Sequence, residues 1–343
     1  MAFILNMDGP MDLFISLIIP VYNRPEEIRE LLDSLLYQTY DRPYEVVIVE
    51  DGSQQRSEEV IKAFEDQLEI SYYFKENSGP GDSRNFGMRQ AKGNYFIILD
   101  SDCLLPPQYL TTVSKALEQR YVDCFGGPDT AHEDFTKTQK AINYAMTSLL
   151  TTGGIRGNKT AANSFQPRSF NMGISRVAFE STGGFGKIHP GEDPDLSIRL
   201  WKNGFKTCLI PEAYVYHKRR VDFHKFFTQV KKFGLVRPIL NKWHPGTAKL
   251  TYWFPTVFIT GFFLSLILSL SGVKWPLLVY LLYFFLLLLD SLIKNKDLSI
   301  AFLSLAAVLV QFTGYGIGFL KSTFLLTFSK KKPEELFPTL FFK

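Results

Sequence analysis

The chain has 343 residues, of which 46% are hydrophobic and 15% aromatic, and its formal net charge is +4. This size allows one sizeable domain and a further region. Three cysteines occur, Cys103, Cys124 and Cys208, and they lack metal-ligand spacing. Their odd number argues against a disulfide framework and favours a reducing compartment.

The mean hydropathy near zero conceals two unlike parts. Up to about Asn241, apolar runs alternate with charged, helix-like stretches, and beyond it apolar residues dominate almost to the end. We therefore expect a soluble domain followed by a membrane anchor. No basic segment precedes the first apolar residues, and Asp8 and Asp12 interrupt them, so no secretory signal is expected.

Strand and helix patterns alternate over the first part of the chain. Apolar strand patterns cover residues 14–20, 44–50, 69–74 and 95–99. Between them one helix begins at Pro25, where proline and the acids Glu26 and Glu27 are favoured; further helices are expected over 57–67 and after 77–81. This order predicts an α/β fold with a Rossmann-like, mostly parallel sheet, right-handed crossovers, and ligand sites at the carboxyl ends of the strands.

The strand pattern at 95–99 ends at two carboxylates, Asp100 and Asp102. Its unbroken apolar run is typical of a strand buried on both faces. Two carboxylates this close repel each other unless a cation lies between them, and hard divalent cations take such oxygen ligands. The alternative is an ordinary polar turn, because Asp and Ser are common turn residues.

Two other strand patterns also end in polar residues. Tyr22 and Asn23 follow the first strand, and Glu50 and Asp51 close the second. Each pair alone is compatible with a polar turn, but together they are what a nucleotide site at the carboxyl ends requires. The sequence has no Gly-x-x-x-x-Gly-Lys loop and no Gly-x-Gly-x-x-Gly fingerprint, so P-loop or dinucleotide binding has little support.

Four segments in order along the chain carry a family resemblance. They are SLIIPVYN (16–23), VIVEDGS (47–53), GDSRN (81–85) and LDSD (99–102), and together they resemble the successive motifs of family 2 glycosyltransferases with the GT-A fold. The resemblance covers roughly residues 14–220, and the ordered set is far more specific than any single motif. It implies a nucleotide-sugar donor and a divalent cation, Mn²⁺ or Mg²⁺.

The resemblance also implies roles for individual residues. By this likeness Asp51 reads the nucleobase, Arg84 assists at the nucleotide, and Asp100 and Asp102 hold the ribose and the diphosphate-bound metal. Glu50 departs from the family pattern, which more often has aspartate, so a role for Glu50 itself is doubtful. The remaining donor-binding candidates in the first loop are Pro20, Tyr22 and Asn23.

The middle of the chain is expected to serve the second substrate. A strand ends at 125–128, a helix covers 136–150, and residues 151–166 have the composition of a mobile loop. The segment 169–175 resembles the family's glycine-containing stretch, in which a side chain at Gly173 would crowd the donor sugar. The alternative is a plain strand with a glycine kink.

Residues 191–200 hold a second group of acids. Pro194 marks a helix start, so Glu192 and Asp193 lie at the positive end of the helix dipole. With Asp195 these are more acids than a cap needs. The family's Glu-Asp motif matches Glu192 and Asp193 and implies that Asp193 is the general base that deprotonates the acceptor hydroxyl.

Strands are expected over 205–210 and 213–216, and His217 follows them directly. A lone histidine after a strand is commonly structural. In several GT-A enzymes, however, a histidine in this place completes the metal site, so His217 is also a candidate metal ligand.

A basic segment comes next. Aromatic and aliphatic residues at near-helical spacing interrupt it, which predicts an amphipathic helix in a membrane interface; nucleic-acid binding is the weaker alternative. Asp222 is the one acid within it. The bases are Lys218, Arg219, Arg220, Lys225, Lys231, Lys232, Arg237, Lys242 and Lys249.

Three apolar stretches, 253–270, 275–293 and 298–320, are each near the length that spans a bilayer. The basic segment before them places the first domain in the cytosol by the positive-inside rule. Three crossings would leave the lysines at 330–332 outside, against the same rule. Either one stretch is re-entrant or the tail folds back, so two or three crossings remain open.

These observations predict a glycosyltransferase that is anchored in the cell membrane by more than one transmembrane helix and has a cytosolic catalytic domain. It would transfer a sugar from a nucleotide-sugar to a lipid or lipid-linked saccharide without processivity, and the family resemblance implies a single displacement with inversion. The alternatives are a processive polysaccharide synthase and a non-catalytic nucleotide-binding scaffold of an export complex. The expected division is 1–220 catalytic, 221–250 interfacial, 251–328 transmembrane and 329–343 tail.

Overall fold

The computed structural model describes residues 12–130, 135–152, 165–217 and 222–342. The N-terminal residues on which the secretory-signal prediction depends therefore lie mostly outside the described residues, as does most of the predicted loop 151–166. The chain forms two compact units. We call them the sheet unit (Met1–His132, Lys159–Lys218 and Phe342–Lys343) and the helical unit (Glu133–Asn158 and Arg219–Phe341).

The sheet unit is built on a seven-stranded sheet in the order β3-β2-β1-β4-β8-β6-β9. The first four strands in chain order, which occupy one side of the sheet, are parallel, and β8 runs antiparallel to both of its neighbours. The predicted mostly parallel α/β sheet is thus confirmed. The strands are β1 Ile15–Val21, β2 Tyr44–Asp51, β3 Ile70–Lys75, β4 Tyr95–Leu99, β6 Cys124–Gly126, β8 Asn171–Ser175 and β9 Thr207–Leu209.

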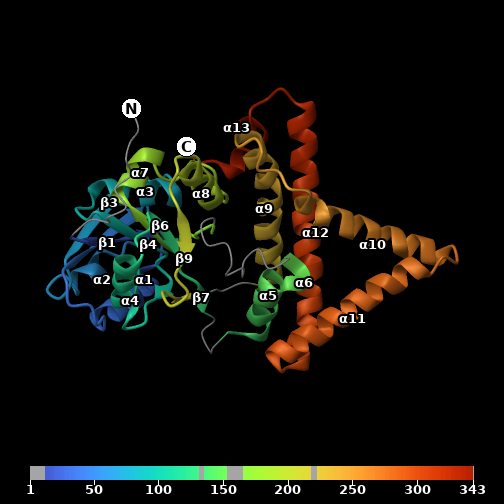
Figure 1. Ribbon diagram of the computed structural model, residues 1–343, viewed down its shortest axis with the longest axis horizontal. Coiled ribbons are helices and arrows are strands. Elements are labelled where there is room, and N and C mark those ends of the chain that lie inside the picture. Colours follow the sequence, from blue (N-terminus) through green and yellow to red (C-terminus); the bar gives the residue numbers. More distant parts are fainter. Residues whose placement is uncertain (1–11, 131–134, 153–164, 218–221, 343) are drawn as a thin grey trace. The chain divides into compact units, whose positions relative to one another are not determined.

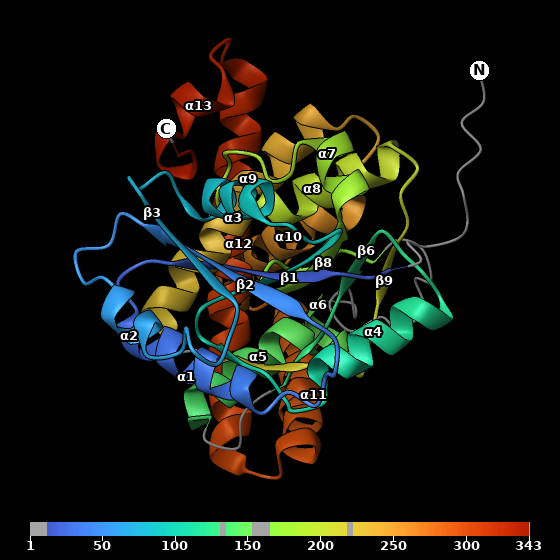
Figure 2. The same cartoon turned by 90° about the vertical axis from the view of Figure 1, so that its left-hand side faces the viewer.

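Helices cover both faces of this sheet (Figure 2). Successive residues of a strand point to opposite faces, so alternate residues of β1 and β4 enter the two hydrophobic cores. One core includes α1 Pro25–Leu36, α2 Glu58–Lys62 and α4 Tyr109–Gln119. The other includes α3 Pro80–Gln90, α7 Arg176–Thr182 and α8 Glu192–Lys202.

A small second sheet positions the loop after β4. It consists of β5 Cys103–Leu104, β7 Asp129–Thr130 and β10 Val215–His217. Strand β10 pairs antiparallel with β5, which sets His217 opposite Cys103. The segment that follows Asp102 is therefore held by main-chain pairing with the end of β10.

The helical unit contains the helices after residue 219 and one segment from the middle of the chain. That segment, α5 Lys137–Thr147 and α6 Leu149–Thr152, leaves the sheet unit between β7 and β8. The sequence predicts this segment in the catalytic part, residues 1–220. The later helices are α9 Phe223–Trp243, α10 Phe254–Leu270, α11 Trp275–Asn295, α12 Leu298–Phe328 and α13 Pro333–Leu336, with short 3₁₀ turns at Leu250–Trp253 and Pro338–Leu340.

Among the described residues, three helices are long and apolar enough to cross a membrane: Leu250–Leu270, Trp275–Asn295 and Leu298–Phe328. The last of these packs closely against α9 through glycines. A Cβ atom on Gly318 would lie 2.3 Å from the carbonyl oxygen of Lys231, and one on Gly234 would lie 2.2 Å from that of Tyr315. The two backbones approach so closely that no side chain fits between them at these positions.

Candidate active site

Asn23, one of the residues that the sequence assigns to the donor, joins the loops after β1 and β2. The main-chain N–H of Asn23 donates to Ser53 Oγ at 2.7 Å, and Asn23 Oδ1 accepts from the N–H groups of Gln54 and Gln55. Asn23 adopts a positive φ of 53°, which asparagine tolerates better than most residues. Tyr22 is exposed beside it, and Pro20 is half-buried near the end of β1.

Glu50 is buried and holds its own loop together. One carboxylate oxygen accepts from Ser53 Oγ and the other from the N–H of Ser57 at 2.8 Å. The tyrosine Tyr72 adds a longer contact of 3.4 Å to the second oxygen. Glu50 thus has a structural function in its own loop. The sequence likewise assigns it no donor-binding role, because it departs from the aspartate of the family pattern.

Asp51 fixes the segment that leads into α3. Its Oδ1 accepts from Lys75 Nζ at 2.6 Å and from the N–H of Ser78 at 3.0 Å, and its Oδ2 accepts from the N–H of Gly79 at 2.9 Å. Gly79 precedes the helix with a φ of 93°, a conformation that favours glycine. Asp51 and the start of α3 are therefore joined in one hydrogen-bonded group.

Phe342 lies against this group within the sheet unit. Its N–H donates to the carbonyl oxygen of Lys187 at 3.1 Å, and its ring is 5.8 Å from the ring of His189. A Cβ atom on Gly79 would lie 2.3 Å from the Phe342 ring. Glycine at this position allows the ring to rest on the backbone.

Arg84, on α3, links two acidic segments that are far apart in the sequence. Its Nη2 donates to Asp100 Oδ1 at 2.9 Å, and its Nη1 lies 3.4 Å from Glu192 Oε1. The Arg84 side chain is 5% exposed, so its charge depends on these two partners for compensation. The end of β4 and the start of α8 are thereby brought to one guanidinium.

Asp102 has a cationic partner of its own. Arg24 Nη1 forms an ion pair with Asp102 Oδ2, and the Arg24 side chain is 44% exposed. The two carboxylates after β4 are thus each neutralised by an arginine, one buried and one accessible to solvent. This is the charge compensation that the close pair requires.

Among the described residues, no cluster of three or more His, Cys, Asp and Glu side chains is arranged to hold a metal ion. The side chain of His217 is not among them. The main-chain pairing nevertheless places His217 opposite Cys103, one residue after Asp102. The assignment of Asp102 and His217 as metal ligands stays a prediction.

Asp193 has the properties of a group that exchanges a proton. Its Oδ2 accepts from the N–H of Ser169 at 3.2 Å, whereas its Oδ1 is buried and has no hydrogen-bond partner among the described residues. Burial raises the pKa of Asp193 to about 6; the Glu192 carboxylate adds to the rise, and Arg84 and Arg168 oppose it. A carboxyl with such a pKa is available as a base near neutral pH.

Glu192 behaves differently although it is the next residue. Burial alone would raise its pKa, but the hydrogen bond from His189 Nδ1, at 2.8 Å, and the charges of His189 and Arg84 hold the pKa of Glu192 below its ordinary value. Glu192 is therefore the charged anchor, and Asp193 is the carboxyl whose protonation changes. Asp195, the third acid, pairs with Arg199 at 2.7 Å.

Gly173 has a packing reason to be glycine. It lies in the middle of β8, opposite Ile97 of β4 and Phe125 of β6. A Cβ atom on Gly173 would lie 2.0 Å from the Phe125 ring. Its proposed place beside the donor sugar stays a prediction.

The sequence did not single out the partners that set these charges, namely Arg24, Lys75 and His189. His189 stands three residues before Glu192, which is a signal for a side-chain contact at the start of a helix. Lys75 closes a strand beside Asp51, and Arg24 precedes the helix-starting proline. For Lys75 and Arg24, the neighbouring residues in the sequence do not indicate which carboxylate each side chain pairs with.

A family model for glycosyl transferase family 2 matches residues 16–183. The chain contains a glycosyl transferase family 2 domain. The match includes Asp51, Arg84 and the two carboxylates after β4, and it ends before Asp193.

The matches to individual relatives cover only part of each relative's length. An uncharacterized glycosyltransferase of Rickettsia typhi is 42% identical over 93 residues, which are 27% of this chain and 28% of that protein. The chondroitin synthase of Escherichia coli is 26% identical over 236 residues, 60% of this chain and 34% of that one. The chain spans less than a third of the length of the first curated relatives it matches.

A solved structure shares the fold over most of the chain. The mannosyltransferase PcManGT of Pyrobaculum calidifontis, in complex with GDP-Man and Mn²⁺, has a TM-score of 0.56 and 17% identity, and the match covers 92% of this chain and 88% of that one. At this identity the likeness shows the fold alone. The predicted GT-A fold of the family 2 domain is confirmed.

The Gly173→Ala substitution should destabilise the family 2 domain, because the new methyl group overlaps the Phe125 ring. Overpacking of this kind costs about 1–3 kcal/mol. We expect a lower melting temperature in thermal unfolding, and partial recovery in a Gly173→Ala, Phe125→Leu double variant. An unchanged melting temperature together with a higher KM for the donor would instead assign Gly173 to the donor site.

Proposed function

We propose that the chain is a membrane-anchored glycosyltransferase that transfers a sugar from a nucleotide-sugar to a lipid or lipid-linked saccharide. The observation that carries this proposal is the position of Arg84, which joins the loop of Asp100 to the segment of Glu192 and Asp193. In this way the residues assigned to the donor and the residue assigned to the acceptor belong to one charged cluster. The family 2 domain supports the same reaction class.

Asp193 would act as the general base. The acceptor hydroxyl gives its proton to Asp193, the acceptor oxygen forms a bond to the anomeric carbon, and the bond from that carbon to the diphosphate breaks. The nucleoside diphosphate leaves with the electron pair of the broken bond. Because the acceptor oxygen attacks opposite to the leaving group, this single displacement inverts the configuration of the anomeric carbon. Glu192 stays charged beside Arg84, and its charge adds to the rise that burial causes in the pKa of Asp193.

The loop after β4 suits a divalent cation. Asp102 supplies carboxylate oxygen, and its present cationic partner, Arg24, is exposed enough to move aside. His217, whose main chain is paired opposite Cys103, is the second proposed ligand for Mn²⁺ or Mg²⁺. When bound, such an ion would neutralise the charge that develops on the departing diphosphate.

The membrane location rests on the three apolar helices and the bases before them. The positive-inside rule then places the family 2 domain in the cytosol of a multi-pass membrane protein. A lipid-linked acceptor would be concentrated in the plane of the bilayer, and each base of α9 would attract its phosphate by about 1 kcal/mol. These bases include Lys225, Lys231 and Lys232.

A processive synthase is the second candidate, because the match to chondroitin synthase covers 60% of this chain. Processive synthases carry a Gln-x-x-Arg-Trp motif near the membrane, and the segment Gln229-Val-Lys-Lys-Phe233 does not match it. We therefore propose one transfer per encounter. A scaffold without catalysis would not need the raised pKa of Asp193.

Incubation of membranes that contain the protein with a panel of nucleotide-sugars tests the proposal. We expect one nucleotide-sugar to yield a lipid whose mass increases by a single sugar, and we expect EDTA to abolish the reaction until Mn²⁺ or Mg²⁺ is restored. Asp102→Asn should lower the rate more than Asp100→Asn does. Full turnover in EDTA would contradict the metal assignment, and a ladder of added sugars would favour the processive synthase.

Asp193→Asn should lower kcat by about 10²–10⁴-fold and leave nucleotide-sugar affinity nearly unchanged, because the base acts on the acceptor. In the parent, kcat should fall as the pH drops through about 6, where Asp193 takes up a proton. Asp195→Asn is the matched control on the same helix: it breaks the pair with Arg199 and should lower stability rather than kcat. Retained turnover in Asp193→Asn with weaker donor binding would move the base to Glu192 or Asp195.

A further inference from the structure

The three apolar helices of the helical unit have unequal surroundings. α10 meets α12 through its first turns: the Phe254 ring is 5.5 Å from the Phe312 ring, and Thr256 Oγ1 donates to the Gly316 carbonyl at 3.2 Å. α11 meets α12 near its end, where Ser291 Oγ lies 2.8 Å from Ser304 Oγ. The other ends of α10 and α11 join in a turn, so the two helices form a hairpin that projects from α12 (Figure 1).

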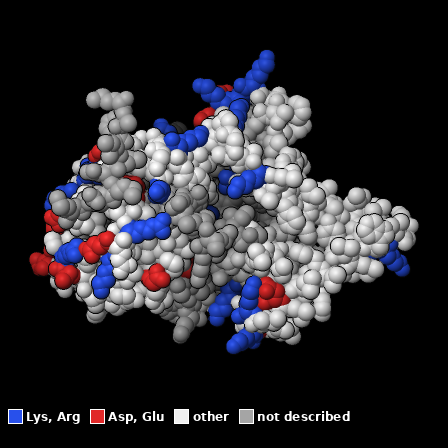
Figure 3. All heavy atoms as spheres, in the orientation of Figure 1, with Lys and Arg blue, Asp and Glu red and all other residues white. Residues whose placement is uncertain are grey.

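The surface of this hairpin is apolar. Leu270 is 90% exposed and Trp275 is 69% exposed at the turn, and no acid or base occurs between Phe254 and Leu270. The face seen in Figure 3 is almost free of charged side chains along the hairpin. With 17 and 21 residues, the helices are about 26 and 32 Å long at 1.5 Å per residue. Both lengths are close to the ~30 Å of a bilayer core.

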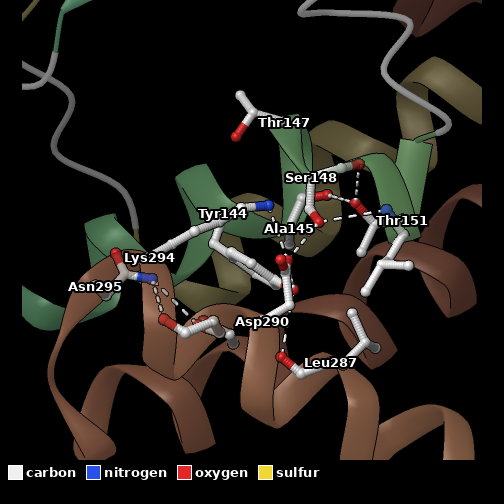
Figure 4. A network of polar contacts seen from close by, with 12 residues as sticks. Tyr144, Ala145, Thr147, Ser148, Thr151, Leu287, Asp290, Lys294 and Asn295 are labelled. Carbon is white, nitrogen blue, oxygen red and sulfur yellow. Dashed lines mark hydrogen bonds and ion pairs between the residues drawn. The ribbon is translucent and has the colours of Figure 1, made fainter.

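The base of the hairpin is polar. Asp290, near the end of α11, accepts hydrogen bonds from Tyr144 at 2.6 Å, Ser148 at 3.1 Å and Lys294 at 2.8 Å (Figure 4). Between α11 and α12, Asp297 pairs with Lys137 of α5 at 2.9 Å. Such charged groups belong at the boundary between lipid and water, since a charge at the bilayer centre costs about 2.5–3.5 kcal/mol or more.

α12 connects this polar base with α9. The glycine contacts hold α9 against the second half of α12, backbone to backbone. α9 carries Lys231, Lys232 and Arg237, and the guanidinium of Arg237 lies 4.6 Å from the centre of the Tyr252 ring. If α12 crossed the bilayer, these three cations would enter its core with it, at the same cost for each.

α12 has instead the surface of a helix that lies in the interface. Its exposed residues Ile317, Leu320, Phe324 and Phe328 are three or four positions apart and form an apolar stripe. Exposed lysines border the stripe at 321 and at 330–332. α9 covers the opposite face of this half of α12, so the stripe and its bordering bases give the two packed helices an amphipathic outer surface, which is typical of helices that lie along a membrane.

We propose that only the α10–α11 hairpin crosses the membrane, and that α12 lies along the surface of the leaflet with its stripe in contact with lipid. Two crossings return the lysines at 330–332 to the side of the α9 bases, so the conflict of three crossings with the positive-inside rule disappears. This inference rests on the proposed membrane location of the glycosyltransferase. It does not depend on the transfer reaction.

Single cysteines in the full-length protein test this topology. Thr228→Cys marks α9, Ser271→Cys marks the turn of the hairpin, and Thr339→Cys marks the chain after α12; all three positions are exposed. A membrane-impermeant maleimide is applied to intact cells and to lysed cells. The unmodified protein gives the background, because Cys103 and Cys124 are buried and Cys208 is half-buried.

We expect Ser271→Cys to be labelled in intact cells, and Thr228→Cys and Thr339→Cys to be labelled only after lysis. Labelling of Thr339→Cys in intact cells would show that α12 crosses, and labelling of Ser271→Cys only after lysis would show that the hairpin does not. Val273→Cys and Pro338→Cys replace any variant that fails to accumulate in membranes. The transfer activity of the same variants is measured separately. A contrary labelling result therefore overturns the proposed topology without overturning the proposed reaction.

Discussion

The site depends on the ion pairs that the buried guanidinium of Arg84 forms. A charge in this position is costly unless it is paired, and the two carboxylates of Asp100 and Glu192 supply the pairing. Burial raises the pKa of the adjacent Asp193 and the Glu192 carboxylate adds to the rise, whereas Arg84 opposes it. The same guanidinium therefore links the loop after β4 to the segment of the proposed base and limits the rise in the pKa of Asp193.

Local pattern was sufficient for much of the sheet unit. The apolar run at Tyr95–Leu99 becomes the buried strand β4, and α1 begins at Pro25 as its proline and acids indicated. The helix expected over 57–67 is shorter, Glu58–Lys62, with turns after it. Strand existence and order follow from periodicity, whereas helix length depends on contacts that periodicity does not contain.

Long-range pairing was not visible in the sequence. Nothing local shows that β8 enters the sheet antiparallel between β4 and β6, or that Phe125 fills the space at Gly173. Likewise the segment 137–152 has an ordinary amphipathic pattern, yet it folds with the helical unit through Tyr144 and Asp290. The apolar stretch of α12 is long enough to span a membrane. Its glycine contacts, which the sequence does not reveal, show that the basic helix α9 is packed against it.

A double-mutant cycle on Arg84 and Glu192 tests the central claim most directly. The unfolding free energy of the full-length protein is measured for Arg84→Met, Glu192→Gln and the double variant. The account predicts that Arg84→Met alone costs about 3–5 kcal/mol, because it removes the buried cation that pairs with Glu192 and Asp100. The double variant should cost less than the sum of the singles, with a coupling of about 0.5–3 kcal/mol. Costs that add to within about 0.5 kcal/mol would contradict it.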